Sequence, residues 1–337
     1  MGLALLANVS AYDFGYISAG RLVERTANTL DTMDGLERYC GHFYNWYDTQ
    51  SLTPLFPLYV SAVDSGNLAG HLLVLRAALV ELADEPIVGR RLFHGLSAAL
   101  QVLADLSRDT VHAKAATELH EIIGKVLNTP PATLAAAQEY LRQLADCASR
   151  MVVQMTGKGD QPGSQLQWWA AAFIRQCDDA QAELKLFAPW LESMSTPFFN
   201  DDLTSLGDIP TLRQVLTIAD KFLPVLAQRQ SLEIPGDEEQ WLSDLQSHLS
   251  AAGGHAATRM HGIERLSRLS NKLAQMEYGF LFDTASRLLV IGYNVSERRQ
   301  DASFYDLLAS EARFAAFVAI AQGQLPQESW FALGRLL

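Results

Sequence analysis

Apolar residues recur at helical spacing along nearly the whole chain of 337 residues. Through 18–38 they follow a period of about 3.6 residues, and a stripe of leucines runs at the same spacing through 66–84. Prolines and glycines interrupt this pattern but do not replace it with the strict alternation typical of strands. The sequence therefore predicts an all-α fold.

The boundaries of the helices follow from the same pattern and from capping residues. Asp64 or Ser65 is expected to cap the helix at 66–84. Ser303, with Asp306 three positions later, matches a capping box, so another helix is expected to begin there. Pro326 is expected to open a last short helix. The other predicted helical segments are 3–10, 18–38, 91–127, 132–156, 164–192 and 256–277.

One small β-hairpin is expected among these helices. The apolar pieces 278–282 and 287–291 flank the turn signal formed by Asp283-Thr284-Ala285-Ser286. Two short apolar runs around such a turn are typical of paired antiparallel strands.

Composition excludes several classes of function. The net charge is −12, and no basic block offsets it, so we expect no nucleic-acid partner. The three cysteines are far apart and lack metal-ligand spacing, and phosphate loops and H-E-x-x-H motifs are absent, so no metal or cofactor is predicted. No run of about 18 uncharged apolar residues occurs, so we expect a soluble segment without a transmembrane helix.

The stretch from Glu37 to Leu79 is rich in aromatic and short polar side chains. Rings such as Trp46 and Tyr47 can cover the apolar faces of a sugar, while a side chain such as Asp48 fixes its hydroxyls. The same composition is also typical of a core whose polar groups are satisfied, and that alternative stays open.

Asp64, Asn67 and His71 follow an i, i+3, i+7 spacing, which places them on one side of a helix start. They could contact a ligand there, or Asp64 could cap the helix while the other two bond the loop above. Glycosyl chemistry usually needs two carboxylates about 5–10 Å apart, and Asp48 with Asp64 is a candidate pair. For His42 a structural role is the favoured interpretation.

A second group of polar and aromatic candidates lies near the C-terminal end. It consists of Tyr293, Asp301 and Tyr305. Asp301 could equally cap a helix, and Tyr305 could equally be a packing residue.

Two blocks resemble a known family. Both are similar to sequences of the cyclic β-1,2-glucan synthases. The first block consists of FGYISAGRLVERTANTLDTMDGLERYCGHFYNWYDT and YVSAVDSGNLAGHLLVLR. The second is LFDTASRLLVIGYNVSERRQDASFYDLLASEARFAAFVAIAQGQLPQESWFALGR. The resemblance covers about residues 1–84 and 256–337. It implies a parent enzyme at the bacterial inner membrane with three parts: a glycosyltransferase using UDP-glucose, a central glucoamylase-like domain and a phosphorylase-like domain.

These sequence segments resemble the central domain of the family. The resemblance implies an (α/α)6-type toroid that closes β-1,2-glucan into a ring by transglycosylation. Residues 1–84, 85–255 and 256–337 would be successive parts of this one domain, on the cytoplasmic side of the membrane. The family's catalytic glutamates lie past the counterpart of Arg335. The resemblance thus implies a fragment with an incomplete toroid that binds β-1,2-glucan but lacks catalytic residues, and whether the chain alone is an enzyme stays open.

The expected substrate-binding residues combine the motif matches with side-chain chemistry. Two alternatives remain, namely part of a β-1,2-glucan hydrolase built on the same toroid and a non-catalytic helical module that binds sugar. The residues expected at the glucan are Trp46, Tyr47, Asp48, Asp64, Asn67, His71, Tyr293, Asp301 and Tyr305.

Overall fold

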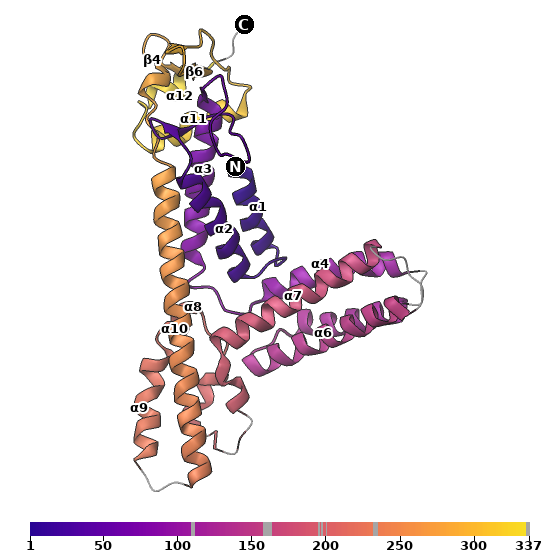
Figure 1. Ribbon diagram of the computed structural model, residues 1–337. Helices are drawn as coiled ribbons and strands as arrows, with labels where there is room; N and C mark the ends of the chain where they lie inside the picture. The colour runs from indigo at the N-terminus through magenta and orange to yellow at the C-terminus, as the bar shows by residue number, and fades with distance from the viewer. Residues whose placement is uncertain are drawn as a thin grey trace. The chain divides into compact units, whose positions relative to one another are not determined.

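The computed structural model describes residues 1–108, 112–157, 164–194, 196, 198–199, 201–231 and 235–334. Helices dominate these residues (Figure 1), which confirms the predicted all-α class. The chain divides into two compact units, each assembled from separate stretches of sequence. The first unit contains Met1–Val9, Glu24–Val80 and Ile263–Leu337, and the second contains Ser10–Val23 and Glu81–Gly262.

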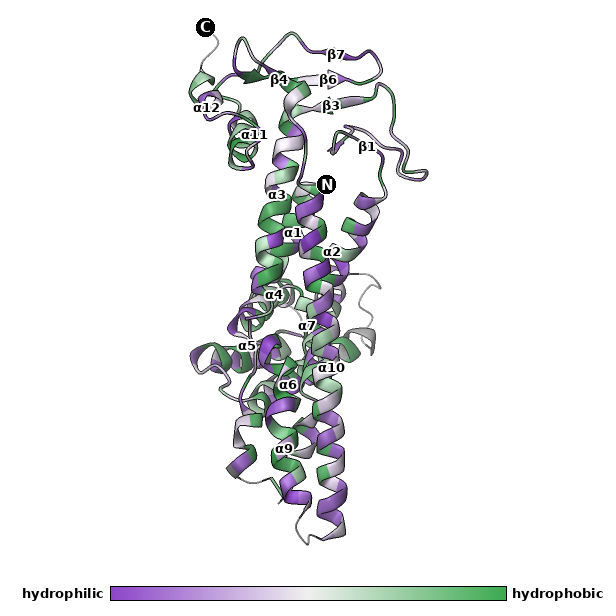
Figure 2. Cartoon of the chain, turned by 90° about the vertical axis from the view of Figure 1, so that its left-hand side faces the viewer, coloured by the Kyte–Doolittle hydropathy of each residue, from purple (hydrophilic) through white to green (hydrophobic). Residues whose placement is uncertain are grey.

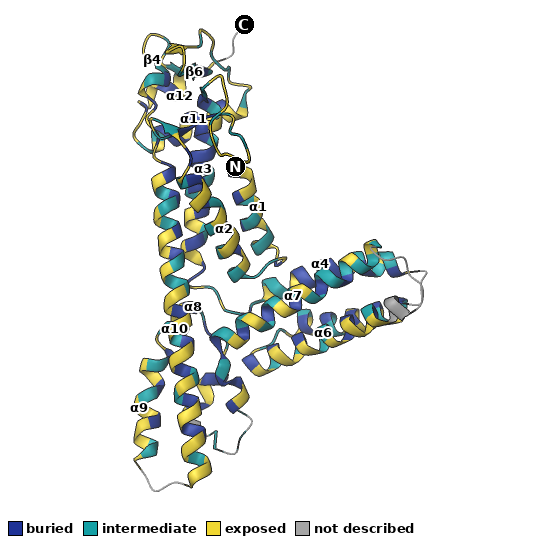
Figure 3. Cartoon of the chain, in the orientation of Figure 1, coloured by how far each residue is buried: buried dark blue, intermediate teal, exposed yellow. Residues whose placement is uncertain are grey.

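The first unit is built around α3 (Ala62–Glu81). This helix is apolar on most of its circumference (Figure 2), a pattern typical of a helix that is covered on several sides. Its leucines Leu72, Leu75 and Leu79 are fully buried, and buried residues follow the helix along its length (Figure 3). The other helices with residues in this unit are α1 (Gly2–Asp13), α2 (Ala19–Asp34), α10 (Gly236–Leu273), α11 (Ser310–Ala321) and α12 (Glu328–Ala332).

The start of α3 differs from the prediction. The helix begins at Ala62 rather than at residue 66, and its capping side chain is Ser61, whose Oγ accepts a hydrogen bond from the Asp64 amide at 3.2 Å. Asp64 and Ser65 were the wrong choice for the cap because both already lie in the first turn of the helix. Their side chains are therefore available for other contacts.

A three-stranded sheet leads directly into α3. It contains β3 (Tyr59–Ser61), β6 (Gly292–Asn294) and β7 (Arg299–Gln300), which lie side by side in Figure 2. The antiparallel register between β3 and β6 pairs Val60 with Tyr293. Gly292 is required opposite Ser61, because a side chain there would collide with the ring of Tyr59. The sheet thus joins two segments that are far apart in sequence.

The predicted hairpin is confirmed. Strands β4 (Phe282–Asp283) and β5 (Leu288–Leu289) pair in antiparallel fashion, and the Asp283 carboxylate accepts a 2.7 Å hydrogen bond from the Ser286 amide within the turn. A further short pair, β1 (Arg38–Tyr39) with β2 (His42–Phe43), was not predicted.

The helix predicted to begin at Ser303 is wrong, since α11 begins only at Ser310. The Ser303 carbonyl accepts a hydrogen bond from the Ile291 amide, and Phe304 forms a β-bridge with Val290. These pairings hold the segment extended, so they override the local capping signal. Instead of capping a helix, Asp306 accepts a 2.9 Å hydrogen bond from the Leu308 amide. The last short helix, predicted from Pro326, is present as α12.

The second unit contains a bundle of four helices. Helix α6 packs against α5 and α7, and α4 packs against α5 and α7. The single segment predicted at 91–127 is instead two helices, because folding back buries the apolar stripe of each against the other. The helices and 3₁₀ turns of this unit, apart from its part of α10, are α4 (Arg90–Ser107), α5 (Ala113–Asn128), α6 (Leu134–Gly157), α7 (Gln165–Phe187), η1 (Pro189–Ser193), η2 (Asp201–Gly207), α8 (Leu212–Leu216) and α9 (Ile218–Gln230).

Helix α10 also differs from its prediction, because it starts at Gly236 rather than at 256 and ends at Leu273. Asp237, Glu238 and Glu239 occupy its first turn, where negative charge interacts favourably with the free N–H groups of a helix start. The helices of the described ranges do not close into a barrel, so the toroid implied by the family resemblance is not seen in them. Most of the gap between the predicted segments 132–156 and 164–192 falls outside the described residues.

Candidate functional site

An open cleft of about 590 Å³ lies in the first unit, at the start of α3. Residues from the beginning of α1, from the loop after β2, from the first turns of α3 and from the first turn of α11 line its walls. Four of the residues expected from the sequence come together here, namely Trp46, Asp64, Asn67 and His71.

Trp46 forms an exposed wall of the cleft. Its carbonyl accepts a hydrogen bond from the Leu55 amide, and its neighbour Asn45 is held by two bonds, from its amide to the Tyr59 carbonyl and from the Ser61 amide to its side-chain oxygen. The indole lies 6.4 Å from the Tyr59 ring, centroid to centroid, and remains 49% exposed. A half-exposed indole on a fixed backbone is a suitable surface for stacking a ligand ring.

Asp64, Asn67 and His71 enter the cleft from one side of α3. The Asn67 amide nitrogen donates a 2.7 Å hydrogen bond to the Val63 carbonyl, which leaves its side-chain oxygen directed to other partners. The His71 ring lies directly against Gly2 and 6.2 Å from the Phe314 ring. Burial, together with the Met1 amino group, lowers the pKa of His71, so the imidazole is neutral at pH 7.

Tyr47 and Asp48 do not line this cleft. The Tyr47 hydroxyl donates a 2.7 Å hydrogen bond to the Glu37 carbonyl and accepts one from the Tyr44 amide, so both of its bonding roles are used within the loop. Asp48 accepts hydrogen bonds from the Ser51 amide, the Ser51 hydroxyl and the Gln50 amide, and these bonds lower the pKa of its carboxyl. Asp48 therefore uses its carboxylate within its own loop and does not line the cleft that contains Asp64, its suggested partner for acid–base chemistry.

Tyr293 belongs to an aromatic cluster beside the sheet. Its ring stacks on Tyr39 with centroids 5.8 Å apart and meets the edge of Phe280 at 5.1 Å. Asp301 instead accepts a hydrogen bond from the Tyr59 hydroxyl. Because the Tyr59 ring lies 6.4 Å from the Trp46 ring, Asp301 contacts the cleft wall only indirectly, through Tyr59.

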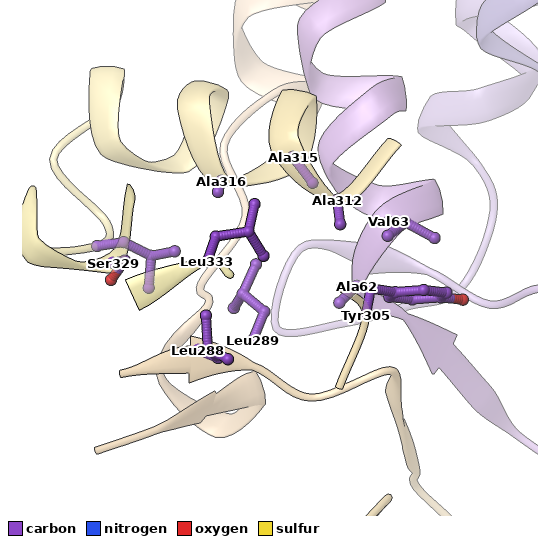
Figure 4. A pocket seen from close by; sticks show the side chains of 11 residues that line it. Ala62, Val63, Leu288, Leu289, Tyr305, Ala312, Ala315, Ala316, Ser329 and Leu333 are labelled. Carbon is purple, nitrogen blue, oxygen red and sulfur yellow. The ribbon is translucent and has the colours of Figure 1, made fainter. Parts of the chain in front are cut away.

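Tyr305 lines a much smaller cavity of about 20 Å³ that adjoins the start of α3. The cavity walls are mostly apolar, and the tyrosine ring lies beside Ala62 with its hydroxyl pointing away from Leu288 and Leu289 (Figure 4). Burial and then the negative charges of Asp64, Glu311 and Asp301 raise the pKa of Tyr305. The hydroxyl of Tyr305 therefore interacts electrostatically with both cleft carboxylates, Asp64 and Glu311.

Among the polar helix residues that line the cleft, Ser65 and Glu311 were not predicted as site residues. Glu311 is brought there by the contact between α11 and α3, where a side chain at Gly66 would collide with Ala315. Gly66 faces Ala315, and Gly70 faces Phe314 and Val318 of the same helix. Two glycines one helical turn apart are a signal for such close packing, although they do not identify which helix approaches. Local periodicity alone contained no signal for Glu311.

In the ranges that the structure describes, no cluster of histidine, cysteine or acidic side chains has the arrangement of a metal site. Of the helices described, none is long and apolar enough to cross a membrane.

Comparison with known proteins gives a clear relative. No family model matches the chain. The cyclic beta-(1,2)-glucan synthase NdvB of Rhizobium meliloti (strain 1021) is 30% identical over 346 aligned residues, which cover 99% of this chain. The chain spans only 10% of the length of that protein. The resemblance seen in the sequence is thus confirmed, and the chain is a relative of one segment of the cyclic β-1,2-glucan synthases.

Proposed function

We propose that this chain provides a cleft that holds β-1,2-glucan within a cyclic glucan synthase. The observation that carries the proposal is the meeting of Trp46, Asp64, Asn67 and His71 in one open cleft, in a chain related to such a synthase. The exposed indole supplies a surface for a glucosyl ring, and the polar side chains of α3 bind its hydroxyls.

The remaining expected residues take supporting roles in this proposal. Asp301 positions Tyr59 beside Trp46, and Tyr47 and Asp48 fix the loop that carries the indole. Tyr293 maintains the aromatic cluster under the sheet, and Tyr305 packs at the base of the cleft. In this proposal these five expected residues do not contact the glucan directly. They support the residues that do.

At the level of the parent enzyme, the proposal follows the family resemblance. The segment would work inside a glucoamylase-like domain that closes linear glucan into a ring by transglycosylation. Its partners would be the UDP-glucose-using glycosyltransferase and the phosphorylase-like domain of the same synthase, at the bacterial inner membrane. Ring closure requires that two ends of one chain be held together, and a cleft that binds glucan without cutting it serves this step.

We infer that the chain alone binds glucan without turning it over. A general acid must keep its proton near neutral pH, which usually requires burial in apolar surroundings. Asp64 and Glu311 are both exposed to solvent, so neither carboxyl has the buried, apolar surroundings that a general acid usually requires. Incubation of the purified chain with linear β-1,2-glucan should leave the glucan unchanged in chromatography.

A second candidate function is β-1,2-glucan hydrolysis. It is favoured by one observation, that Asp64 and Glu311 line the same cleft, as the two carboxylates of a glycosidase do. The two functions differ in their products, because a hydrolase releases short linear glucans and a cyclising enzyme releases rings. Product analysis of the full-length parent synthase therefore separates them.

Calorimetric titration with linear β-1,2-glucan tests the binding proposal directly. Trp46→Ala should weaken binding about tenfold or more, because the stacking surface is lost. Trp168→Ala is a matched control, since Trp168 is also an exposed indole (59%) but belongs to α7 of the second unit. Equal losses in both variants, or no binding by the native chain, would overturn the proposal.

A further inference from the structure

The β1–β2 hairpin is fastened to the segment that follows α10 by a contact at one residue, Glu277. The Glu277 amide donates a 3.1 Å hydrogen bond to the Cys40 carbonyl, and Nε2 of His42 lies 2.9 Å from the Glu277 carbonyl. Between these two bonds, Gly41 lies against the Gln275 backbone, where a side chain would collide. Residues 40–42 and 275–277 thus form a contact that we call the hairpin clasp.

The geometry of the hairpin clasp fixes the protonation state of His42. A carbonyl oxygen only accepts hydrogen bonds, so Nε2 carries the proton of the neutral ring and Nδ1 carries none. Nδ1 is buried and has no hydrogen-bond partner in the part of the chain that the structure describes. A second proton on this ring would therefore place a buried N–H group, and a positive charge, where nothing accepts them.

The groups around His42 do not compensate a positive charge. Its ring packs in T-shaped geometry against Tyr278 and Phe280, with centroids 5.0 and 5.2 Å apart. The Tyr278 hydroxyl is buried, and burial raises its pKa, so it stays uncharged. The Glu277 side chain, on the facing segment, is exposed to solvent. Burial accordingly lowers the pKa of His42 to about 4, although the bond to the Glu277 carbonyl opposes this effect.

The remaining charged or titratable side chains near the hairpin clasp have other partners or are exposed. They are Arg38 (paired with Asp34 and placed over the Phe43 ring), Lys272 (paired with Asp34), Tyr39 (stacked on Tyr293) and Cys40 (exposed). The hairpin clasp therefore depends on an imidazole that must stay neutral.

The hairpin clasp borders one wall of the cleft. Phe43 and Tyr44, which follow His42 directly, belong to the cleft lining. The Tyr44 amide donates a 2.9 Å hydrogen bond to the Tyr47 hydroxyl, which in turn donates to the Glu37 carbonyl just before the hairpin. This wall is thus built on the hairpin, and opening of the hairpin clasp removes one of its supports.

We propose that the hairpin clasp is a pH switch of the cleft: neutral His42 keeps the hairpin closed, and protonation of His42 opens it and loosens the wall formed by Phe43 and Tyr44. In the open hairpin the imidazole is in water, where its pKa is about 6.5. Opening therefore takes up a proton, so the closed state is fully favoured above pH 6.5 and is lost progressively as the pH falls below it. Control of glucan binding by this switch rests on the proposed function, whereas acid opening of the hairpin clasp does not.

Hydrogen exchange of the Glu277 amide in the full chain measures opening of the hairpin clasp. After correction for the intrinsic exchange rate, the opening equilibrium should rise about 20-fold from pH 7 to pH 5, given pKa values of about 6.5 open and about 4 closed. His42→Gln retains a donor for the Glu277 carbonyl and cannot titrate, so it should abolish the rise. His71 is unchanged in this variant, and any effect of its titration remains.

His120→Gln is the matched control, because His120 is an exposed histidine in α5 of the second unit and should leave the rise intact. The Ala62 amide, which donates to the Ile291 carbonyl at 3.0 Å, reports unfolding of the sheet at the start of α3. The Glu277 amide should open more readily than the Ala62 amide and with a smaller dependence on urea. If both open together at every pH, the hairpin is released only by unfolding and the switch is wrong.

Saturating linear β-1,2-glucan tests the connection to the cleft. A ligand that binds only the closed state should slow exchange of the Glu277 amide, because it stabilises that state. An acid response that persists in His42→Gln would overturn the switch. If calorimetry shows glucan binding but exchange at Glu277 is not slowed, the hairpin clasp does not control the cleft, and the binding function stands. If glucan does not bind at all, the proposed function fails together with control of the cleft, while acid opening is still decided by exchange alone.

Discussion

The two units of the molecule each contain an open cleft of similar size, about 590 Å³ in the first unit and about 550 Å³ in the second. The second cleft is lined by α6, α7, η1 and His248 of α10. Its volume would admit the same ligand, so size does not distinguish the two sites. Their chemistry does.

Two of the charged residues in the second cleft, Arg142 and Glu139, are paired with each other. Arg142 is paired with Glu139 at 2.7 Å and with Asp146 at 2.9 Å, and His248 lies 3.3 Å from the Ser193 hydroxyl. No phenylalanine, tyrosine or tryptophan lines this cleft in the described residues. The first cleft instead has an exposed indole in its lining, which indicates that a stacking surface, rather than volume, distinguishes the two clefts.

The largest expected effect concerns acid stability of the first unit. His42 is fully buried, and burial lowers its pKa to about 4, because protonation would place a charge among the rings of Tyr278 and Phe280. The pKa of histidine in an unfolded chain is about 6.5. Between pH 6.5 and 4 the unfolded chain therefore binds a proton at this residue and the folded chain does not. Stability is complete above pH 6.5 and should fall by about 3 kcal/mol as the pH drops to 4.

Hydrogen exchange as a function of pH measures this effect separately in peptides from each unit. Peptides around His42 should lose protection as the pH falls from 6.5 to 4. His42→Phe should remove that pH dependence, because it keeps a ring without the titrating group. An unchanged dependence in the variant would show that another group controls acid unfolding.

The second-largest expected effect is on the free energy of unfolding, when one glycine in each unit is replaced by alanine. Gly66→Ala should destabilise the chain by about 2 kcal/mol, since the added methyl meets Ala315. Gly124→Ala in α5 should instead stabilise by about 0.5–1 kcal/mol, because nothing lies near its Cβ position and alanine is the better helix former. Urea unfolding of the two variants measures the change in unfolding free energy of each. A change of the same sign in both variants would contradict the close contact of α3 with α11.

A smaller effect is expected from Ser65→Ala. The Ser65 hydroxyl belongs to the lining of the open cleft and makes no hydrogen bond in the described residues, so its removal should leave the unfolding free energy nearly unchanged. Affinity for β-1,2-glucan should nevertheless drop about fivefold, the loss of one ordinary hydrogen bond. Calorimetry with thermal unfolding on the same samples measures both, and a loss of stability would mean that the hydroxyl has a partner inside the protein.

The smallest effect is expected in the second unit. Lys185→Ala alters the wall of the second cleft and should change glucan affinity by less than about twofold, since surface substitutions away from a site have small effects. A loss as large as that of Trp46→Ala would transfer the glucan site to the second unit and remove the distinction between the clefts.

The parts of the cleft that depend on local periodicity could be predicted from the sequence. The spacing of Asp64, Asn67 and His71 placed them on one side of a helix, and the turn at Asp283–Ser286 identified its hairpin. These features depend on residues a few positions apart, where helix and turn geometry leaves little freedom.

Features that depend on distant pairing could not be predicted in this way. Glu311 enters the cleft only through the contact of α11 with α3, and the segment at Ser303 is extended only because it pairs with Ile291. Asp48 lies outside the cleft lining for a different reason, because its hydrogen bonds to Ser51 and Gln50 use the carboxylate within its own loop. A composition typical of a binding site also occurs where short polar residues stabilise the backbone.

The pairing of β3 with β6 has a consequence for how the protein is made. Tyr59 and Asp301, which bond across this sheet, are 242 positions apart, whereas the bundle α4–α7 uses neighbouring segments. During synthesis the bundle can form while the last part of the chain is still being translated, but the strand that anchors the start of α3 arrives late. Closing so long a loop is slow, so the cleft should be the last part of the protein to mature, and a ribosome-bound chain ending before Gly292 should present Trp46 without a finished cleft around it.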